Sequence, residues 1–294
     1  MKNPIVHSFF DKATFTVSHV VADPETKKAA IIDSVMDFDP VDGQLSHGSA
    51  DRIVELVNRE GYEVVYILET HAHADHVTAA QYLKEKYKAP VAIGERITKV
   101  QEVFKTVYNE PDTFKTDGSQ FDHLWRDGEE FSIGSLTGKV IFTPGHTPAD
   151  VSYLIGDALF VGDSIFMPDY GTARCDFPGG DATVLYSSIQ DLYALPNETR
   201  VYLCHDYLPA GRGVYTYSTT LGEEKQKNIH VHEGVSEEEF VTMRNNRDRT
   251  LSMPRLIIPS IQINIRAGHL PVAEANGVSY LKTPVNGPFV KQII

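Results

Sequence analysis

The chain has 294 residues, 41% of them hydrophobic, and a formal net charge of −13 at pH 7, which allows a sizeable core and disfavours binding to nucleic acid or anionic lipid. Its two cysteines, Cys175 and Cys204, are too few for a disulfide framework. It has no apolar run long enough for a signal peptide or a membrane helix, so we expect a cytoplasmic protein with neither a nucleic-acid nor a membrane partner.

The first part of the chain is predicted to contain a β-hairpin. Two segments rich in β-branched residues, 14–23 and 27–34, flank the turn-like Asp-Pro-Glu-Thr at 23–26. A loop rich in Asp, Gly and Ser is expected at 37–50. It leads into a helix at 50–60, whose apolar residues share one face.

Strand and helix then alternate. The segment "EVVYILET" (63–70) is a nearly continuous apolar run, which is typical of a buried strand in a layered α/β protein. We expect a helix from about Val77 to Tyr87, a short strand at 90–94, and a helix with a polar excursion at 95–120.

The second half of the chain is predicted to hold more strands and then helices. Strands are expected at 130–135, 139–148, 150–164 and 200–207. Helices are expected at 181–195, 220–228 and 236–248. In the last of these, Ser236 with Glu239 three residues later predicts a capping box.

No repeat, low-complexity tract or linker composition divides the chain, so we predict one domain over residues 1–294. Its core is expected at about 14–210, followed by C-terminal helices and a tail at 211–294. The part of the tail from Pro254 onward is expected to be irregular, because it is rich in Pro and Gly. Its apolar residues either pack on their own domain or pair with a second subunit, and we favour a homodimer.

Ligand-type side chains gather at the ends of the predicted strands. The segment "ETHAHADHVTAA" (69–80) places three histidines and an aspartate directly after the 63–70 strand. The complete set is His71, His73, Asp75, His76, His146, Asp163 and His205. Strand ends of an α/β sheet converge on one edge, so we expect these side chains to lie together.

A metal explains this set better than core packing does, because burying so many polar groups without a partner costs stability. Imidazole and carboxylate ligands without thiolate select Zn, Mn or non-haem Fe. The glycine before His146 allows the backbone to turn, so that the imidazole points back to the strand ends. Asp163, in "FVGDS", has a similar setting.

Three segments, "THAHADH", "TPGHTPADVSYLIGDALFVGD" and "YLCHDY", resemble the metallo-β-lactamase superfamily. The resemblance covers about residues 14–210. It implies an αββα four-layer sandwich of the α/β class with a C-terminal extension and a metal centre on the edge of two facing sheets.

Two glutathione-linked branches of the superfamily compete. Ala74 stands where the hydroxyacylglutathione hydrolases (glyoxalase II) usually carry a bulky aromatic residue. "HAHADH" and "GTARCDFPGGDATVLYSSI" are more similar to the persulfide dioxygenases, also called sulfur dioxygenases. "STTLGEEKQKN" resembles both branches. The longer 209–217 segment departs from the smaller members and alters the expected pocket wall.

The dioxygenase resemblance implies one Fe(II), held by His71, His146 and Asp163, and a reaction of glutathione persulfide with O2. A face of two histidines and one carboxylate leaves coordination positions open. Residues of the vacant second-metal site, which would orient the ligands, are His73, Asp75, His76 and His205. The glyoxalase II alternative implies two Zn ions bridged by Asp163, which hydrolyse a glutathione thioester.

Further residues have expected roles near the metal. We predict that Tyr207 and Asp75 take part in catalysis and that Tyr207 contacts the substrate or O2, although Tyr207 is equally explained as a core tyrosine. Arg174 is expected to bind a glutathione carboxylate, with an ion pair to Asp176 as the alternative. Arg212 is a second substrate-binding residue, unless it is merely solvated. Cys175 is expected to be a small buried residue near the site rather than a redox group.

Overall fold

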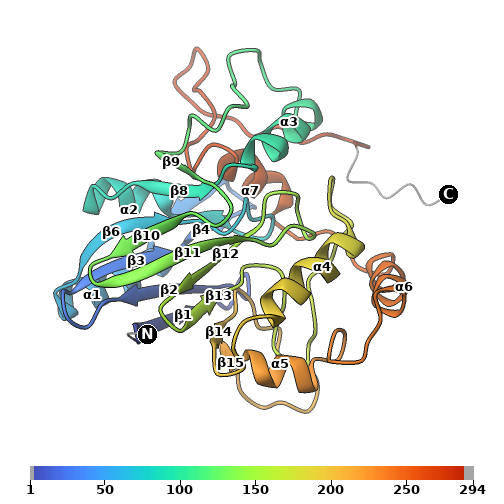
Figure 1. The fold of residues 1–294 in the computed structure, drawn as a ribbon. Helices are drawn as coiled ribbons and strands as arrows, with labels where there is room; N and C mark the ends of the chain where they lie inside the picture. The colour runs from blue at the N-terminus through green and yellow to red at the C-terminus, as the bar shows by residue number, and fades with distance from the viewer. Residues whose placement is uncertain (1–2, 288–294) are drawn as a thin grey trace.

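The computed structural model describes residues 3–287, in which two six-stranded sheets pack face to face (Figure 1). The first sheet has the order β1-β2-β3-β6-β8-β9, with β1 (Ile5–Phe10), β2 (Val17–Ala22), β3 (Lys28–Ile32), β6 (Glu63–Leu68), β8 (Val91–Gly94) and β9 (His123–Trp125). The second has the order β10 to β15, with β10 (Glu130–Ile133), β11 (Leu136–Phe142), β12 (Val151–Ile155), β13 (Ala158–Phe160), β14 (Arg200–Tyr202) and β15 (Ser218–Thr220).

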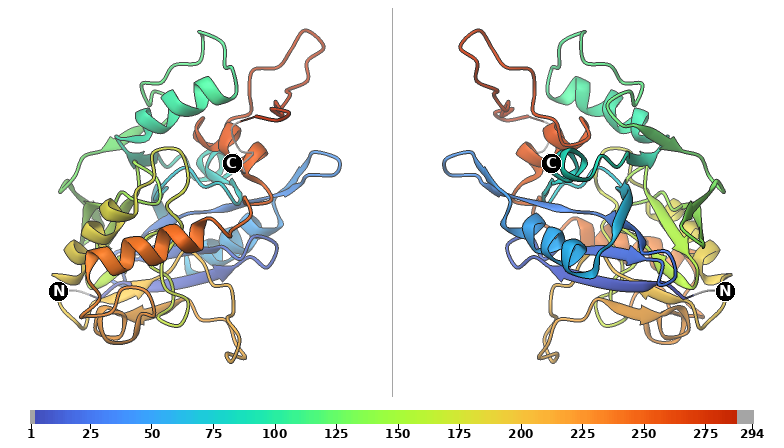
Figure 2. Two further views of the ribbon diagram at one scale, coloured as in Figure 1. Left: turned by 90° about the vertical axis from the view of Figure 1, so that its right-hand side faces the viewer. Right: turned by 90° about the vertical axis from the view of Figure 1, so that its left-hand side faces the viewer.

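Helices cover the outer faces of both sheets. They are α1 (Gly48–Glu60), α2 (Ala80–Tyr87), α3 (Ile97–Val107), α4 (Ala182–Tyr193), α5 (Leu221–Lys227), α6 (Glu237–Asp248) and α7 (Ile257–Asn264). Two opposite views place α1 and α6 on opposite sides of the molecule (Figure 2). This arrangement confirms the predicted αββα sandwich.

Alternating side chains explain the layers. In β2, Val20 packs in the cluster under α1, α2 and α3, whereas Val21 packs between the sheets. In β3, Ile31 packs in the cluster under the helices and Ile32 packs between the sheets. Successive strand residues point to opposite faces, so each apolar strand of the first sheet contributes to two cores. On the other sheet Phe160 joins the inter-sheet cluster.

The strand directions bring the ligand-bearing loops to one edge. β3, β6 and β8 are parallel, so their carboxyl ends lie together. β11 and β13 are both antiparallel to β12, and β14 is parallel to β13, so these three strands also end at a common edge. A backbone hydrogen bond from Val17 to Cys204 (N–O 2.7 Å) joins the two sheets there.

Two elements differ from the sequence prediction near the first helix. The expected loop at 37–50 contains a hairpin of β4 (Val35–Asp39) and β5 (Gln44–Ser46), because Pro40, Asp42 and Gly43 form a turn between two segments that pair. The helix expected from Val77 begins only at Ala80, since β7 (Val77–Thr78) pairs with β4. The 14–34 hairpin and the capping box of α6 are confirmed.

The C-terminal segment is not irregular throughout, as we had expected. Residues of α7 and the turn after it pack into the cluster beneath the first sheet, among them Ile257, Ile261 and Ile265. These apolar side chains are therefore buried within their own chain. Residues 288–294 of the predicted tail lie outside the described residues. The predicted homodimer stays a prediction.

Within residues 3–287, every helix is too short or too polar to cross a lipid bilayer.

A buried ion pair joins the C-terminal segment to the residues after α3, and it should stabilise the fold. Arg266 Nη2 lies 2.6 Å from Glu110 Oε2, and both side chains are almost fully buried. Arg266→Met leaves the Glu110 carboxylate buried without its cation, so we expect the free energy of unfolding to fall by about 3–5 kcal/mol in urea denaturation. Lys227→Met removes an exposed pair with Glu223 and is the control, with an expected loss of about 0–1 kcal/mol. Equal losses in the two variants would contradict this assignment.

Candidate metal centre

Each ligand-type side chain lies in a loop after a strand. Residues 71–76 follow β6, and His146, Asp163 and His205 follow β11, β13 and β14. The backbone before His146 and Asp163 needs glycine: Gly145 has φ +142°, and a Cβ there would lie 2.4 Å from Leu185 Cα. Gly162 has φ +50°, and a Cβ there would lie 2.7 Å from Thr70 Oγ1. Glycine therefore allows both loops to enter a crowded edge.

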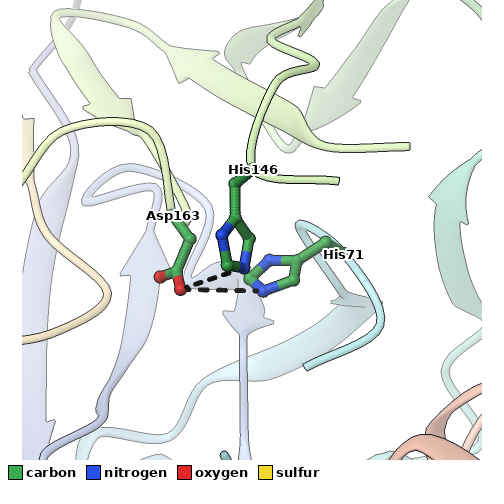
Figure 3. Close-up of side chains that lie close together, drawn as sticks. All are labelled: His71, His146 and Asp163. Carbon is green, nitrogen blue, oxygen red and sulfur yellow. Dashed lines mark ion pairs between the residues drawn. The ribbon is translucent and has the colours of Figure 1, made fainter. Parts of the chain in front are cut away.

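The side chains of His71, His146 and Asp163 point toward one another (Figure 3). Asp163 Oδ2 is 4.0 Å from His71 Nε2 and 3.5 Å from His146 Nε2. One ligand atom from each of the three lies within 4.8 Å of the others. The structure thus brings together the predicted face of two imidazoles and one carboxylate.

A second group of ligand-type side chains adjoins the first group, which is His71, His146 and Asp163. His73, Asp75 and His76 each offer a ligand atom within the same 4.8 Å limit. His205 Nε2 lies 3.3 Å from Asp163 Oδ1 and 3.7 Å from Asp75 Oδ2. Asp163 therefore lies between the two groups, with one oxygen toward each. The donor set is compatible with one metal ion or with two.

Several of these ligand atoms are buried without a hydrogen-bond partner among the described residues. They are His71 Nε2, His73 Nδ1, His76 Nε2, His205 Nε2 and Asp163 Oδ1. Buried polar atoms are normally satisfied, and a metal would satisfy this set. The residues present therefore fit a bound metal.

Hydrogen bonds to the remaining ring nitrogens orient the imidazoles. His146 Nδ1 donates to the Arg174 carbonyl at 2.7 Å, and His205 Nδ1 donates to the Phe15 carbonyl at 3.1 Å. These bonds place the proton on Nδ1 and leave the Nε2 lone pair for a metal. In His73 the roles of the two nitrogens are exchanged: Nε2 contacts Asp33 Oδ1 at 2.9 Å, and Nδ1 is the atom without a partner among the described residues.

Asp33 was missed by the sequence analysis, although it follows a strand like the other acids of the site. Its carboxylate accepts hydrogen bonds from the Thr70 amide and hydroxyl at 2.8 and 2.9 Å, in addition to contacting His73. Asp33 thereby fixes the start of the ligand loop, which is residues 71–76 after β6. The strand-end pattern applied to 27–34 is the signal that could have found it.

Burial sets the protonation of the site. It lowers the pKa of His71 well below its usual value, with His73 and His146 lowering it further. Burial also lowers the pKa of His146, although Asp163 opposes this shift. Both imidazoles are therefore neutral at pH 7, the form that binds metal. Burial raises the pKa of Tyr207 well above its usual value, so its hydroxyl stays protonated and can donate.

A cavity of about 810 Å³ opens beside the first group, a size typical of small-molecule sites. Its lining includes Asp75, His146, Asp163 and the predicted Tyr207. The Tyr207 ring stacks on His205 with a centroid separation of 5.4 Å. The cavity therefore connects the ligand groups with space for a substrate.

The predicted substrate-binding arginines are engaged within the protein. Arg174 lines the cavity, but its Nε and Nη2 donate to Asp176 at 2.6 and 2.8 Å, the alternative that the sequence left open. Arg212 is not among the described residues that line the cavity, and it pairs with Asp206 and Asp169. That either binds substrate stays a prediction.

Arg247 and Arg255 also line the cavity and were missed by the sequence analysis, because neither belongs to a metal-ligand motif or to a segment that resembles the family. Cys175 is buried, and burial raises the pKa of its thiol, so it is a poor nucleophile.

Asn264 of α7 forms hydrogen bonds with the backbone of the ligand loop. Its Nδ2 donates to the carbonyls of His73 and His76, both at 2.8 Å, and its Oδ1 accepts from the Thr78 amide at 3.0 Å. Asn264 is itself buried. The C-terminal segment therefore fixes the backbone that carries three of the ligand-type side chains.

The fold and the site define a metal-binding protein of the metallo-β-lactamase class. The sequence profile of the metallo-β-lactamase superfamily matches residues 12–205. The chain belongs to this superfamily.

Relatives at about 50% identity are named as a hydrolase-like protein and as a glyoxylase. The chain is 51% identical to a β-lactamase hydrolase-like protein of Xylella fastidiosa, over 97% of the chain but 66% of the relative, so it spans just under two thirds of that protein. It is 49% identical to glyoxylase B2 of Dictyostelium discoideum, over 98% of each.

Similarity to persulfide dioxygenases is lower but also extends over most of the chain. The human persulfide dioxygenase ETHE1 is 28% identical, over 90% of this chain and 89% of its own. The crystal structure of ETHE1 from Myxococcus xanthus aligns with a TM-score of 0.70 and 32% identity, over 90% of this chain and all of that one.

The Asn264 contacts predict that this residue supports metal binding. Asn264→Ala leaves two carbonyls and one amide without partners, so we expect a loss of about 1–3 kcal/mol in unfolding free energy and weaker metal retention. The measurements are thermal unfolding of the metal-free protein and metal content after titration with a chelator. Asn276→Ala, which loses two exposed hydrogen bonds, one to Tyr280 and one from the Val278 amide, is the matched control. Unchanged chelator resistance in Asn264→Ala would refute the assignment.

Proposed function

We propose that this protein is a persulfide dioxygenase with one Fe(II) bound by His71, His146 and Asp163. The reaction converts glutathione persulfide, O2 and water to glutathione and sulfite. The sulfane sulfur loses four electrons and O2 gains them, so the reaction needs no further oxidant.

One observation carries the proposal. Two neutral imidazoles and one carboxylate form a compact face beside a substrate-sized cavity, in a chain that resembles a solved ETHE1 structure over 90% of its length. Ala74 adds to this, since it lines the cavity beside the ligands and leaves space there.

When bound, Fe(II) supplies open coordination positions and one-electron chemistry that Zn lacks. The chain supplies orientation and exclusion of water. Tyr207 can donate a hydrogen bond into the cavity, since its hydroxyl stays protonated. The rings of Phe166 and Phe177 line the same cavity and reduce the access of water. Asp75, His76 and His205 would hold the ligand loops in place.

A glyoxalase II-like hydrolase with two Zn ions is the second candidate. It is favoured by the position of Asp163, whose two oxygens face different ligand groups, and by the names of relatives at about 50% identity. In that case the metal pair would activate water to attack a glutathione thioester.

Metal analysis with substrate tests separates the two functions. Anaerobically purified protein should contain about one iron per chain and should consume O2 when glutathione persulfide is added, with sulfite as product. S-lactoylglutathione should not be hydrolysed. Two zinc ions per active chain together with thioester hydrolysis would overturn the proposal.

Single-ligand variants test the mononuclear assignment. His146→Ala should lose iron, because it removes one of three ligands. His76→Ala should retain most of the iron, since that side chain belongs to the second group. Iron content and O2 uptake of both variants are the measurements. Equal metal loss from the two variants would contradict a single iron bound by the first group.

A further inference from the structure

One wall of the cavity comes from the segment that joins α6 to α7. Its lining residues there are Leu251, Ser252, Pro254, Arg255 and Leu256, and Arg247 in the last turn of α6 adjoins them. This wall lies beyond residue 205, where the match to the superfamily profile ends. It is therefore a part of the cavity that the shared metal-binding core does not specify.

Two of the four arginines that line the cavity are neutralised within the protein. Arg174 forms two hydrogen bonds to Asp176. Arg244 is buried and donates from Nε and Nη2 to Asp248 Oδ1 at 2.9 and 2.7 Å. Their positive charges are compensated by these acids.

Arg247 and Arg255 differ from this pair. Both are exposed, and within residues 3–287 neither has a carboxylate within ion-pair distance. Arg247 instead lies over the Tyr170 ring at 5.8 Å from its centroid, and that ring also lines the cavity. In a chain with net charge −13, two uncompensated guanidinium groups at one cavity wall form a local site for anions.

The β4 strand contributes acids to the same cavity. Asp37 and Asp39 line it, and neither has a Lys or Arg partner among the described residues. Asp37 accepts hydrogen bonds from Ser49, and Asp39 from the Val41 amide. A cavity with cations on one wall and acids on another matches a ligand that carries both carboxylate and ammonium groups.

We propose that Arg247 and Arg255 bind a carboxylate of the substrate and so select peptide thiols over uncharged thiols. This inference rests on the proposed function and names the substrate class at the same site. Guanidinium recognises carboxylate through paired charge-assisted hydrogen bonds. Arg174, the arginine that the sequence analysis predicted to bind a glutathione carboxylate, would then line the cavity without binding that carboxylate.

A cycle that changes both enzyme and substrate tests the proposal. Glutathione persulfide is compared with the persulfide of glutathione ethyl ester, in which the glycine carboxylate is blocked, using wild type and the double variant Arg247→Ala/Arg255→Ala. We expect wild type to show about a tenfold higher KM for the ester, and the double variant to show that raised KM with both substrates. The kcat should change by less than about twofold, because the metal group is untouched.

Arg249→Ala is the matched control. Arg249 is an exposed arginine next to α6 whose Nη1 contacts Asn246, and it is not among the residues that line the cavity. It should behave as wild type with both substrates. The inference would be overturned if the double variant kept the wild-type KM for glutathione persulfide. It would also be overturned if the double variant still showed a KM about tenfold higher for the ester than for glutathione persulfide.

Binding of an unreactive probe separates this inference from the proposed reaction. Calorimetry with S-methylglutathione should show an affinity about tenfold weaker for the double variant than for wild type, whichever reaction the metal supports. If wild type consumes no O2 with glutathione persulfide, the proposed function fails. If the probe binds both proteins equally, the carboxylate site fails even when O2 uptake is normal.

Discussion

The site depends on the burial of imidazole and carboxylate groups whose inner atoms have no protein partner. Such atoms destabilise a protein interior unless something compensates for them. Here the other nitrogen of each oriented imidazole is held, as His146 Nδ1 is by the Arg174 carbonyl and His73 Nε2 is by Asp33. The chain therefore directs its unsatisfied atoms at a common space, and a metal there would both complete the fold and supply reactivity.

The two sheets position the metal ligands, and the C-terminal segment supports the ligand loop and lines the cavity. The facing sheets bring together the strand ends that carry the ligands, within the region shared with the superfamily. The C-terminal segment holds the ligand loop through Asn264 and forms a cavity wall with Arg247 and Arg255. Because Asn264 and the two arginines are different residues of the C-terminal segment, changes at Arg247 or Arg255 leave the Asn264 contacts with the ligand loop in place.

The order and type of many elements were predictable because their signals are local. The 14–34 hairpin follows from its turn, and the α6 capping box from two residues. The elements that were missed depend on pairing. β7 is two residues that pair with β4, and α7 is a short apolar helix with Pro259 in its first turn, where proline is tolerated. Its packing on the first sheet, which no local pattern encodes, stabilises it.

By itself the sequence determined the strand ends at which the ligand-type residues lie, because strand periodicity and the spacing of histidines are properties of neighbouring residues. The tertiary structure alone decided the rest: the position of Asp163 between two groups, the pairing of Arg174 with Asp176, and the presence of Arg247 at the cavity. These depend on distances between segments far apart along the chain, which are set when the two sheets and the C-terminal segment pack together.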